Sequence, residues 1–224
     1  GINPFDYASP LNMDKWVYAP GGTQGVATQE LINVLACLFE LMTASDQNLL
    51  RTMLLTQNRL DRFISAPAST SSHHYYKHGL LEHTVEVCLQ ALLLIDEGRA
   101  PSDVDLSQLI LQAILHDFGK LDEYEQMGHG VYTLSNSGLL LGHQIKVALW
   151  AHQAALEMGS YCGERLTQLI HGLTAVNRDC AQSGNRSRKT VESLIANHAD
   201  RLSAASNAQA KGSWLLNNQF CVEV

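Results

Sequence analysis

The stretch His116-Asp117-Phe118-Gly119-Lys120 places an imidazole, a carboxylate and an amine within five residues of one another. It follows residues 106–116, in which apolar side chains recur with helical spacing, so we expect a helix to end near this stretch. Successive helical residues differ by about 100° around the axis, so His116 and Asp117 reach one centre only near a helix end. Gly119 is expected to supply the turn. The stretch therefore predicts a polar site where a buried helix ends.

Histidine and aspartate side chains continue this pattern along the chain. The full set is His83, His116, Asp117, His143, His171 and Asp200. After the first gap its members recur about every 27 to 29 residues, roughly one helical hairpin apart. Each could therefore lie on a different helix and converge in a bundle core. Four imidazoles and two carboxylates are enough donors for two divalent ions, and imidazole favours Fe, Mn, Co, Ni or Zn over Mg and Ca.

Periodicity predicts an all-α domain. We expect helices over residues 26–44, 46–65, 80–94, 106–116, 140–154, 161–177 and 189–209. Ser45-Asp46 is a plausible cap of the second helix, and Ser102 or Asp105 caps the fourth. Residues 128–138 are expected to form a loop or a short hairpin, and residues 178–188 a polar loop.

Composition limits the class of protein. The chain has 224 residues, 46% of them apolar, which suffices for one substantial core. A formal charge of -7 argues against a broad basic groove for duplex nucleic acid. The five cysteines are odd in number and lack CxxC spacing, which is typical of free cytosolic thiols or buried apolar residues and not of a disulfide framework. No apolar run approaches the roughly 18 residues of a membrane span, so we expect a cytoplasmic protein without a membrane partner. Other domains of a longer parent protein are possible partners.

The motifs resemble those of the HD-domain metal-dependent phosphohydrolase superfamily over about residues 71–210. The resemblance is carried by Gly79-Leu80-Leu81-Glu82-His83-Thr84, His116-Asp117-Phe118-Gly119-Lys120, Leu141-Gly142-His143, His171-Gly172 and Asp200. Within the superfamily the chain is most similar to HD domains of 3′→5′ exoribonucleases that also carry an OB-fold, and of conjugative-relaxase-type proteins. The resemblance implies an HD-domain helical bundle at 71–210, with an N-terminal arm and helices at 1–70 and a C-terminal tail at 211–224.

The resemblance also implies roles for individual residues. One ion would be bound by His83, His116, Asp117 and Asp200, and the other by His143, His171 and a bridging Asp117. Asp117 and Lys120 would be the catalytic residues, with Lys120 contacting a phosphate oxygen. Two alternatives stay open. In a one-metal site, His143 and His171 could face the substrate or be core histidines with satisfied hydrogen bonds. Lys120 could simply cap the helix C-terminus.

The chain departs from exoribonuclease-like relatives at three positions. Those relatives have His, Asn and Asp where this chain has Ile170, Arg201 and Ser203. The departures leave the predicted ligands intact, but they weigh against an RNA chain as the substrate.

Two basic clusters are candidates for binding the substrate. His73, His74 and His78 precede the first ligand helix. We expect His74 and His78 as the residues that line the pocket, and the alternative is a solvated loop. Arg178, Arg186, Arg188 and Lys189 form the second cluster. It is either a solvated loop or a lid in which Arg188 grips a phosphate.

The predicted function is hydrolysis of a phosphate ester by a metal-activated water. The substrate would be a small phosphorylated molecule such as a nucleotide or cyclic nucleotide, or the end of a single-stranded nucleic acid. Two other functions are compatible with the same residues. Some HD-fold proteins use this ligand set in a di-iron oxygenase, and a metal-stabilised docking module of a larger mobile-element protein would also retain it.

Overall fold

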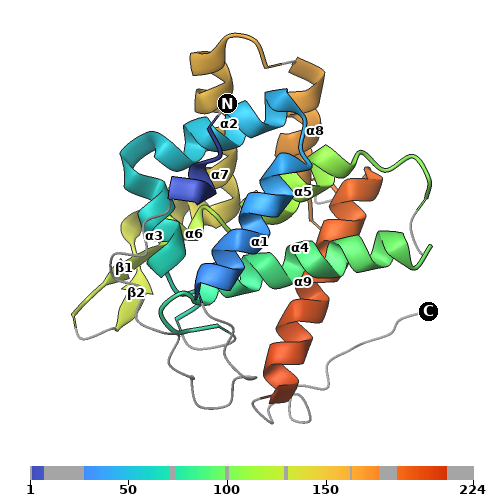
Figure 1. Ribbon diagram of the computed structural model, residues 1–224. Helices are drawn as coiled ribbons and strands as arrows, with labels where there is room; N and C mark the ends of the chain where they lie inside the picture. The colour runs from blue at the N-terminus through green and yellow to red at the C-terminus, as the bar shows by residue number, and fades with distance from the viewer. Residues whose placement is uncertain are drawn as a thin grey trace.

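The computed structural model describes residues 2–7, 28–70, 74–98, 101–128, 131–161, 163–176 and 186–210. Its helices are α1 (Thr28–Glu40), α2 (Ala44–Leu55), α3 (Arg59–Ser65), α4 (Gly79–Asp96), α5 (Leu106–Leu115), α6 (Lys120–Glu123), α7 (Asn136–Met158), α8 (Gly163–Thr174) and α9 (Val191–Ala210), with 3-10 turns η1 (Pro4–Tyr7) and η2 (Thr56–Asn58). Two short strands, β1 (Tyr124–Gln126) and β2 (Tyr132–Leu134), pair antiparallel. The all-α prediction is confirmed (Figure 1). The predicted tail at 211–224, most of the N-terminal arm, His73 and Arg178 lie outside the described residues.

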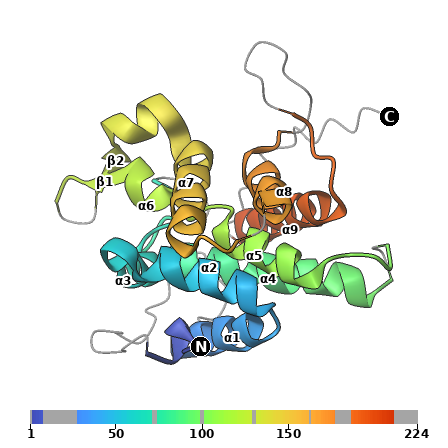
Figure 2. The ribbon, with the colours of Figure 1, turned by 90° about the horizontal axis from the view of Figure 1, so that it is seen from above.

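Helix α5 lies at the centre of the bundle and packs against α2, α4, α8 and α9. In Figure 2, α1 lies on one side of the layer formed by α2, α3, α4 and α5, and α6, α7, α8 and the hairpin lie on the other side. Helix α9 packs across α4 and α5, and α7 packs against α6, α8 and α2. Helix α5 therefore contacts α4, α8 and α9, and the turn after it approaches α7 at His143. These are the helices expected to carry the other candidate ligands.

The turn after α5 is anchored by an aromatic side chain. Phe118 is completely buried and packs against Phe63 at 5.5 Å and Trp150 at 5.8 Å between ring centroids. Such pairs add to the apolar area that each ring buries. The Arg59 guanidinium lies over the Trp150 ring at 4.0 Å and adds a second contact from α3, which also carries Phe63. The aromatic cluster fixes the backbone on either side of Phe118, where Asp117 and Gly119 lie.

The predicted helix over 46–65 is interrupted, which corrects that part of the sequence analysis. Gln57 and Asn58 both have φ of 55°, in the left-handed region, and they separate α2 from α3. Asparagine tolerates this conformation better than most residues, but there is no glycine or proline to indicate the break. The hydrophobic core is continuous from α1–α3 to α4–α9. The domain boundary at residue 70 stays a prediction.

Ser45-Asp46 was expected to cap α2, but Asp46 forms a buried polar junction instead. The cap is Thr43, whose hydroxyl accepts a hydrogen bond from the Asp46 amide. The Asp46 carboxylate is fully buried and accepts hydrogen bonds from Arg165 Nε at 2.8 Å and Tyr161 at 2.6 Å, and also from Ser107. Burial alone would raise the pKa of Asp46, but these hydrogen bonds lower it below its ordinary value. The junction ties α2 to α5 and α8.

Helix α7 is kinked where the sequence predicted one continuous face. Gly142 has φ of 71° and ψ of 167°, a conformation that glycine adopts readily and other residues do not. The kink turns Leu140 to the surface, where it is 83% exposed, although periodicity placed it on the same face as His143.

Of the two predicted caps for α5, Asp105 is the one observed. The hairpin begins four residues earlier than expected, at β1. None of the described helices has the length and hydropathy to cross a bilayer.

Candidate metal centre

Four predicted ligands meet where α4, the turn after α5 and α9 converge. The Nε2 atom of His83 lies 3.2 Å from Nε2 of His116, 3.4 Å from Oδ2 of Asp117 and 3.1 Å from Oδ1 of Asp200. His116 Nε2 lies 3.4 Å from the same Asp117 oxygen and 3.8 Å from Asp200 Oδ1. The ligand atoms of His83, His116 and Asp200 are all within 4.8 Å of one another. The structure thus brings together the four residues predicted for the first ion.

Hydrogen bonds at the far side of each ring fix which nitrogen faces the cluster. His116 Nδ1 lies 2.8 Å from the carbonyl oxygen of Ala113, which only accepts, so Nδ1 is the donor. Ser203 donates its hydroxyl proton to Glu86 at 2.6 Å and therefore accepts from Nδ1 of His83 at 3.0 Å. Both rings consequently turn Nε2 toward the carboxylates. Metal-binding histidines in proteins are oriented in this way, by an acceptor on the nitrogen that is not a ligand.

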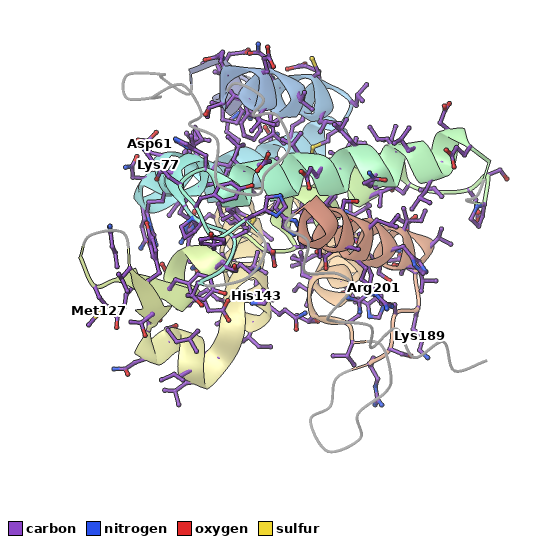
Figure 3. All side chains as sticks on the ribbon, turned by 90° about the horizontal axis from the view of Figure 1, so that it is seen from below. Asp61, Lys77, Met127, His143, Lys189 and Arg201 are labelled. Carbon is purple, nitrogen blue, oxygen red and sulfur yellow. The ribbon has the colours of Figure 1, made fainter. Side chains whose placement is uncertain are left out.

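His143 lies on the other side of Asp117 and is also oriented by an acceptor at its Nδ1 atom. Its Nδ1 donates to Oε2 of Glu123 at 2.9 Å, and its Nε2 lies 3.5 Å from Oδ1 of Asp117. Asp117 therefore turns one oxygen toward His83 and His116 and the other toward His143. Figure 3 shows His143 near the middle of the molecule, at the start of the straight part of α7.

Gly119 lets the backbone before α6 approach α7. Its φ of -65° and ψ of -14° are ordinary right-handed values, so the expected glycine-specific turn is not formed. A Cβ atom there would lie 2.0 Å from the carbonyl oxygen of His143, however. The need for glycine is therefore steric, and it sets how closely His143 approaches Asp117.

His171 is not brought into this cluster. Its Nε2 accepts a hydrogen bond from the backbone amide of Lys189 at 2.9 Å. The nitrogen that would bind a metal is thus engaged by the segment before α9. Burial and the nearby Arg188 and Lys189 lower the pKa of His171, which keeps the ring neutral. The role of His171 as a ligand stays a prediction.

The charges of the cluster are strongly coupled. Burial alone would raise the pKa of Asp117, but Lys120 and His116 hold it well below its usual range. Lys120 Nζ lies 2.7 Å from Asp117 Oδ2. Burial alone would lower the pKa of His83, but hydrogen bonds with Asp117 and Asp200 raise it to about 9. Neighbouring groups thus stabilise the ionised form of both Asp117 and Asp200, which is the form in which a carboxylate binds a metal ion.

A small cavity of about 70 Å³ opens onto the cluster. Its lining includes His116, Asp117, His143, Asp200 and Arg188. The predicted phosphate-binding Arg188 therefore does reach the site. Arg201, at one of the positions that departs from the relatives, is exposed on α9 (Figure 3).

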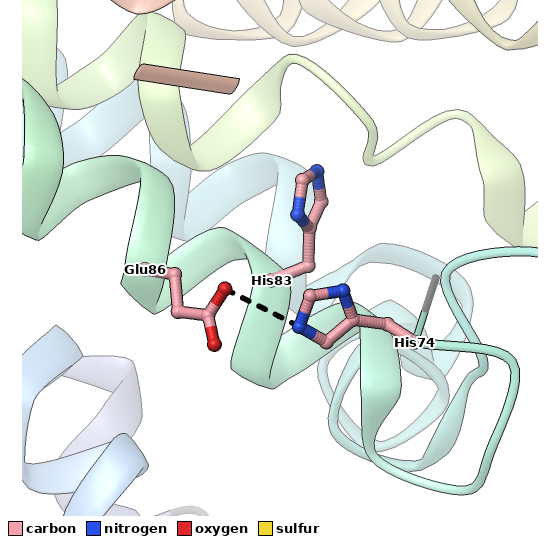
Figure 4. Close-up of side chains that lie close together, drawn as sticks. All are labelled: His74, His83 and Glu86. Carbon is pink, nitrogen blue, oxygen red and sulfur yellow. Dashed lines mark ion pairs between the residues drawn. The ribbon is translucent and has the colours of Figure 1, made fainter. Parts of the chain in front are cut away.

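His74 and His78, the other two residues predicted to bind substrate, do not line this cavity. His78 is buried and its Nδ1 lies 2.6 Å from the carbonyl oxygen of Ile64. His74 has no exposed surface and lies behind His83, with Nε2 3.3 Å from Oε2 of Glu86 (Figure 4). Their surroundings are those of residues that support the site, and a substrate contact for either stays a prediction.

Sequence reasoning missed Glu86 and Glu123, the carboxylates that orient the histidines. Glu86 lies three residues after His83 on α4, so the helical spacing placed it on the same side and was an available signal. Glu123 meets His143 only because α6 packs against α7, and no local pattern indicates that contact. Ser203 was noted only as a departure from the relatives, yet it contacts His83 directly.

Comparisons with known proteins find relatives named 3′-5′ exoribonuclease YhaM. The protein of Bacillus subtilis (strain 168) is 26% identical over 207 residues, which cover 92% of this chain and 62% of that protein. That of Geobacillus sp. (strain WCH70) is 28% identical over 170 residues, covering 76% and 50%. That of Shouchella clausii (strain KSM-K16) is 34% identical over 134 residues, covering 60% and 40%. The chain thus spans about half the length of the curated relatives it matches. No family model and no solved structure matches. The chain is homologous to proteins named 3′-5′ exoribonuclease.

Proposed function

We propose that this chain is a metal-dependent phosphodiesterase of the HD-domain type that hydrolyses the end of a single-stranded nucleic acid. The observation that carries the proposal is the orientation of His83, His116 and His143. Each ring donates from Nδ1 to a protein acceptor. His83 and His116 turn Nε2 toward Asp117 and Asp200, and His143 turns Nε2 toward Asp117. The similarity to proteins named exoribonuclease favours a nucleic-acid end over a free nucleotide or cyclic nucleotide.

The donor set fits a divalent transition metal. Two imidazole nitrogens and two carboxylate oxygens lie together at His83, His116, Asp117 and Asp200, and these donors suit Fe, Mn, Co, Ni or Zn. Such an ion would supply a bound water that ionises near neutral pH. The ion would also neutralise negative charge that develops on the phosphate. A second ion at His143, Asp117 and His171 would require His171 to give up its hydrogen bond to Lys189.

The chain's own residues would orient the ester for in-line hydrolysis. Water adds its oxygen to phosphorus, the bond from phosphorus to the ester oxygen breaks, and a proton reaches the leaving oxygen. Lys120, buried and held charged beside Asp117, is placed to pair with a phosphate oxygen. Arg188 offers a cation on the wall of the small cavity that opens onto the cluster. Cationic side chains of this kind bind phosphate with charge-assisted hydrogen bonds.

The test is hydrolysis by protein that has been stripped with a chelator and then reloaded. Wild-type protein, Asp117→Asn and the exposed-surface control Asp61→Asn are assayed anaerobically with Mn²⁺ on bis(p-nitrophenyl) phosphate and on a labelled single-stranded oligoribonucleotide. We expect metal-dependent turnover of both esters by wild type and by Asp61→Asn, and none by Asp117→Asn. Turnover by the chelated protein, or by Asp117→Asn at the wild-type rate, would refute the proposal. Anaerobic turnover would also exclude oxygen as a reactant.

A further inference from the structure

A second and larger cavity, of about 250 Å³, adjoins Lys120 on the side of the hairpin. Its polar and aromatic lining comes from Arg62, Lys120, Tyr124, Gln126 and Tyr132. Lys120 thus belongs both to this cavity and to the cluster, where its ammonium group lies 2.7 Å from Asp117. A phosphate held by Lys120 would have the rest of its ester within reach of the cavity.

The hairpin turns two aromatic rings toward this space. Gln126 pairs with Tyr132 across the strands, and Tyr124 pairs with Leu134. Alternate residues of a strand share a face, so Tyr124, Gln126 and Tyr132 lie on one face of the hairpin. The two tyrosines are diagonal neighbours, which in an antiparallel pair lie about 7–8 Å apart. Both are half-buried, so each ring keeps a surface against which a flat group can stack.

The cavity has the charge expected of a site for an anionic ligand. Among the described residues that line it, Arg62 and Lys120 are cationic and none is a carboxylate, in a chain with a formal charge of -7. The Arg62 guanidinium is fixed by Asp122 at 2.7 Å and by the carbonyl oxygen of Leu121. Its position is therefore set before a ligand arrives, which reduces the entropy lost on binding.

We propose that this cavity binds the terminal nucleoside of the strand, with the base stacked on Tyr132 and Tyr124 and its phosphate at Lys120. The inference rests on the proposed function and adds the binding site for the base. Aromatic stacking with cationic contacts to the backbone is how proteins bind single strands with little sequence preference. A volume of about 250 Å³ lies just below the roughly 300–1,000 Å³ of drug-sized pockets, so it suits a single nucleoside.

The proposal is tested with Tyr132→Ala, the conservative variant Tyr132→Phe and the control Thr133→Ala. Thr133 is the next residue of the same strand and faces away from the cavity, where it is exposed. Removing one stacking ring is expected to lower kcat/KM on the oligoribonucleotide about 5- to 150-fold, mostly through KM. Tyr132→Phe keeps the ring and should keep most of the activity. Thr133→Ala should match wild type, and thermal melting checks that all variants are folded.

Equilibrium binding separates stacking from phosphate recognition. Adenosine 5′-monophosphate and ribose 5-phosphate are titrated into the Mn²⁺-loaded full chain by calorimetry. Tyr132→Ala should weaken the affinity for the nucleotide by the same factor by which it lowers kcat/KM. Its affinity for the sugar phosphate should stay within about twofold of wild type. Equal weakening of both ligands, or of neither, overturns the inference. If wild type hydrolyses bis(p-nitrophenyl) phosphate while the nucleotide affinity of Tyr132→Ala is unchanged, the inference alone fails. If wild type hydrolyses no ester, the proposed function fails and this inference fails with it.

Discussion

Replacing Ser203 with alanine tests whether the hydrogen bonds behind the cluster serve a metal ion. Ser203 is 1% exposed and joins two partners, accepting from Nδ1 of His83 at 3.0 Å and donating to Glu86 at 2.6 Å. Alanine removes the acceptor and leaves a buried N–H without it, which costs about 1–3 kcal/mol. The His83 ring also loses the contact that directs Nε2 toward Asp117 and Asp200.

The expected effect on metal binding agrees with that free energy. Loss of a hydrogen-bond partner behind a metal ligand typically weakens metal affinity about 10- to 100-fold, which is about 1.4 to 2.7 kcal/mol. We expect this loss for Mn²⁺ in competition with a fluorescent chelator at pH 7.5. Ser206→Ala is the control, because Ser206 lies on the same helix, α9, but is exposed and does not line the cavity at the cluster. A Ser203→Ala variant that is folded and binds Mn²⁺ as tightly as wild type would refute the argument from ring orientation.

Three further variants test the surroundings of the site by thermal and chemical unfolding. Gly119→Ala puts a Cβ atom 2.0 Å from the His143 carbonyl oxygen, so we expect a loss of about 1–3 kcal/mol, and a variant as stable as wild type would contradict the steric argument. Phe118→Ala should cost about 3–5 kcal/mol, because the ring is completely buried, and a loss below 1 kcal/mol would show that the aromatic cluster is not needed. Asp46→Asn should cost about 3 kcal/mol at pH 7, because it leaves Arg165 without its buried partner. The pKa of Asp46 is lowered on folding, so its stabilisation is present above its ordinary pKa of 3.8 and is lost as the pH falls through the folded value. The difference from wild type should therefore shrink in acid, and a constant difference from pH 7 to pH 3 would contradict the assignment.

Helical spacing in the sequence was sufficient to place the ligand-bearing elements. His83 is buried on α4 and meets the half-buried Asp200 of α9, as periodicity predicted. The helix before Asp117 ends where two consecutive candidate ligands require it to end. The break at Gln57 could not be predicted, because the left-handed turn there uses residues that fit equally well in a helix. Spacing also placed His171 on the expected helix, α8. Helical spacing could not determine which group contacts Nε2 of His171, because that contact depends on where the segment containing Lys189 packs.

Contacts between elements that are distant in the sequence could not be predicted either. Gly119 was expected to supply a special turn, whereas its function is to admit the backbone of α7. Glu123 orients His143 from a different element, and the kink at Gly142 sets the direction of that histidine. These features arise from how α6 and α7 pack together, which no single stretch of sequence encodes.

The most direct test of the account is the metal content of the chain. Protein is loaded with Mn²⁺ or Fe²⁺ without oxygen, freed of excess ion by gel filtration and measured by elemental analysis, beside Asp117→Ala treated in the same way. The account predicts at least one tightly bound transition metal per wild-type chain and a value near zero for Asp117→Ala. A second equivalent in wild type that is lost in His171→Ala would establish the second ion. Wild-type protein that is folded and retains no metal, or Asp117→Ala that retains as much as wild type, would contradict the assignment of this cluster as a metal centre.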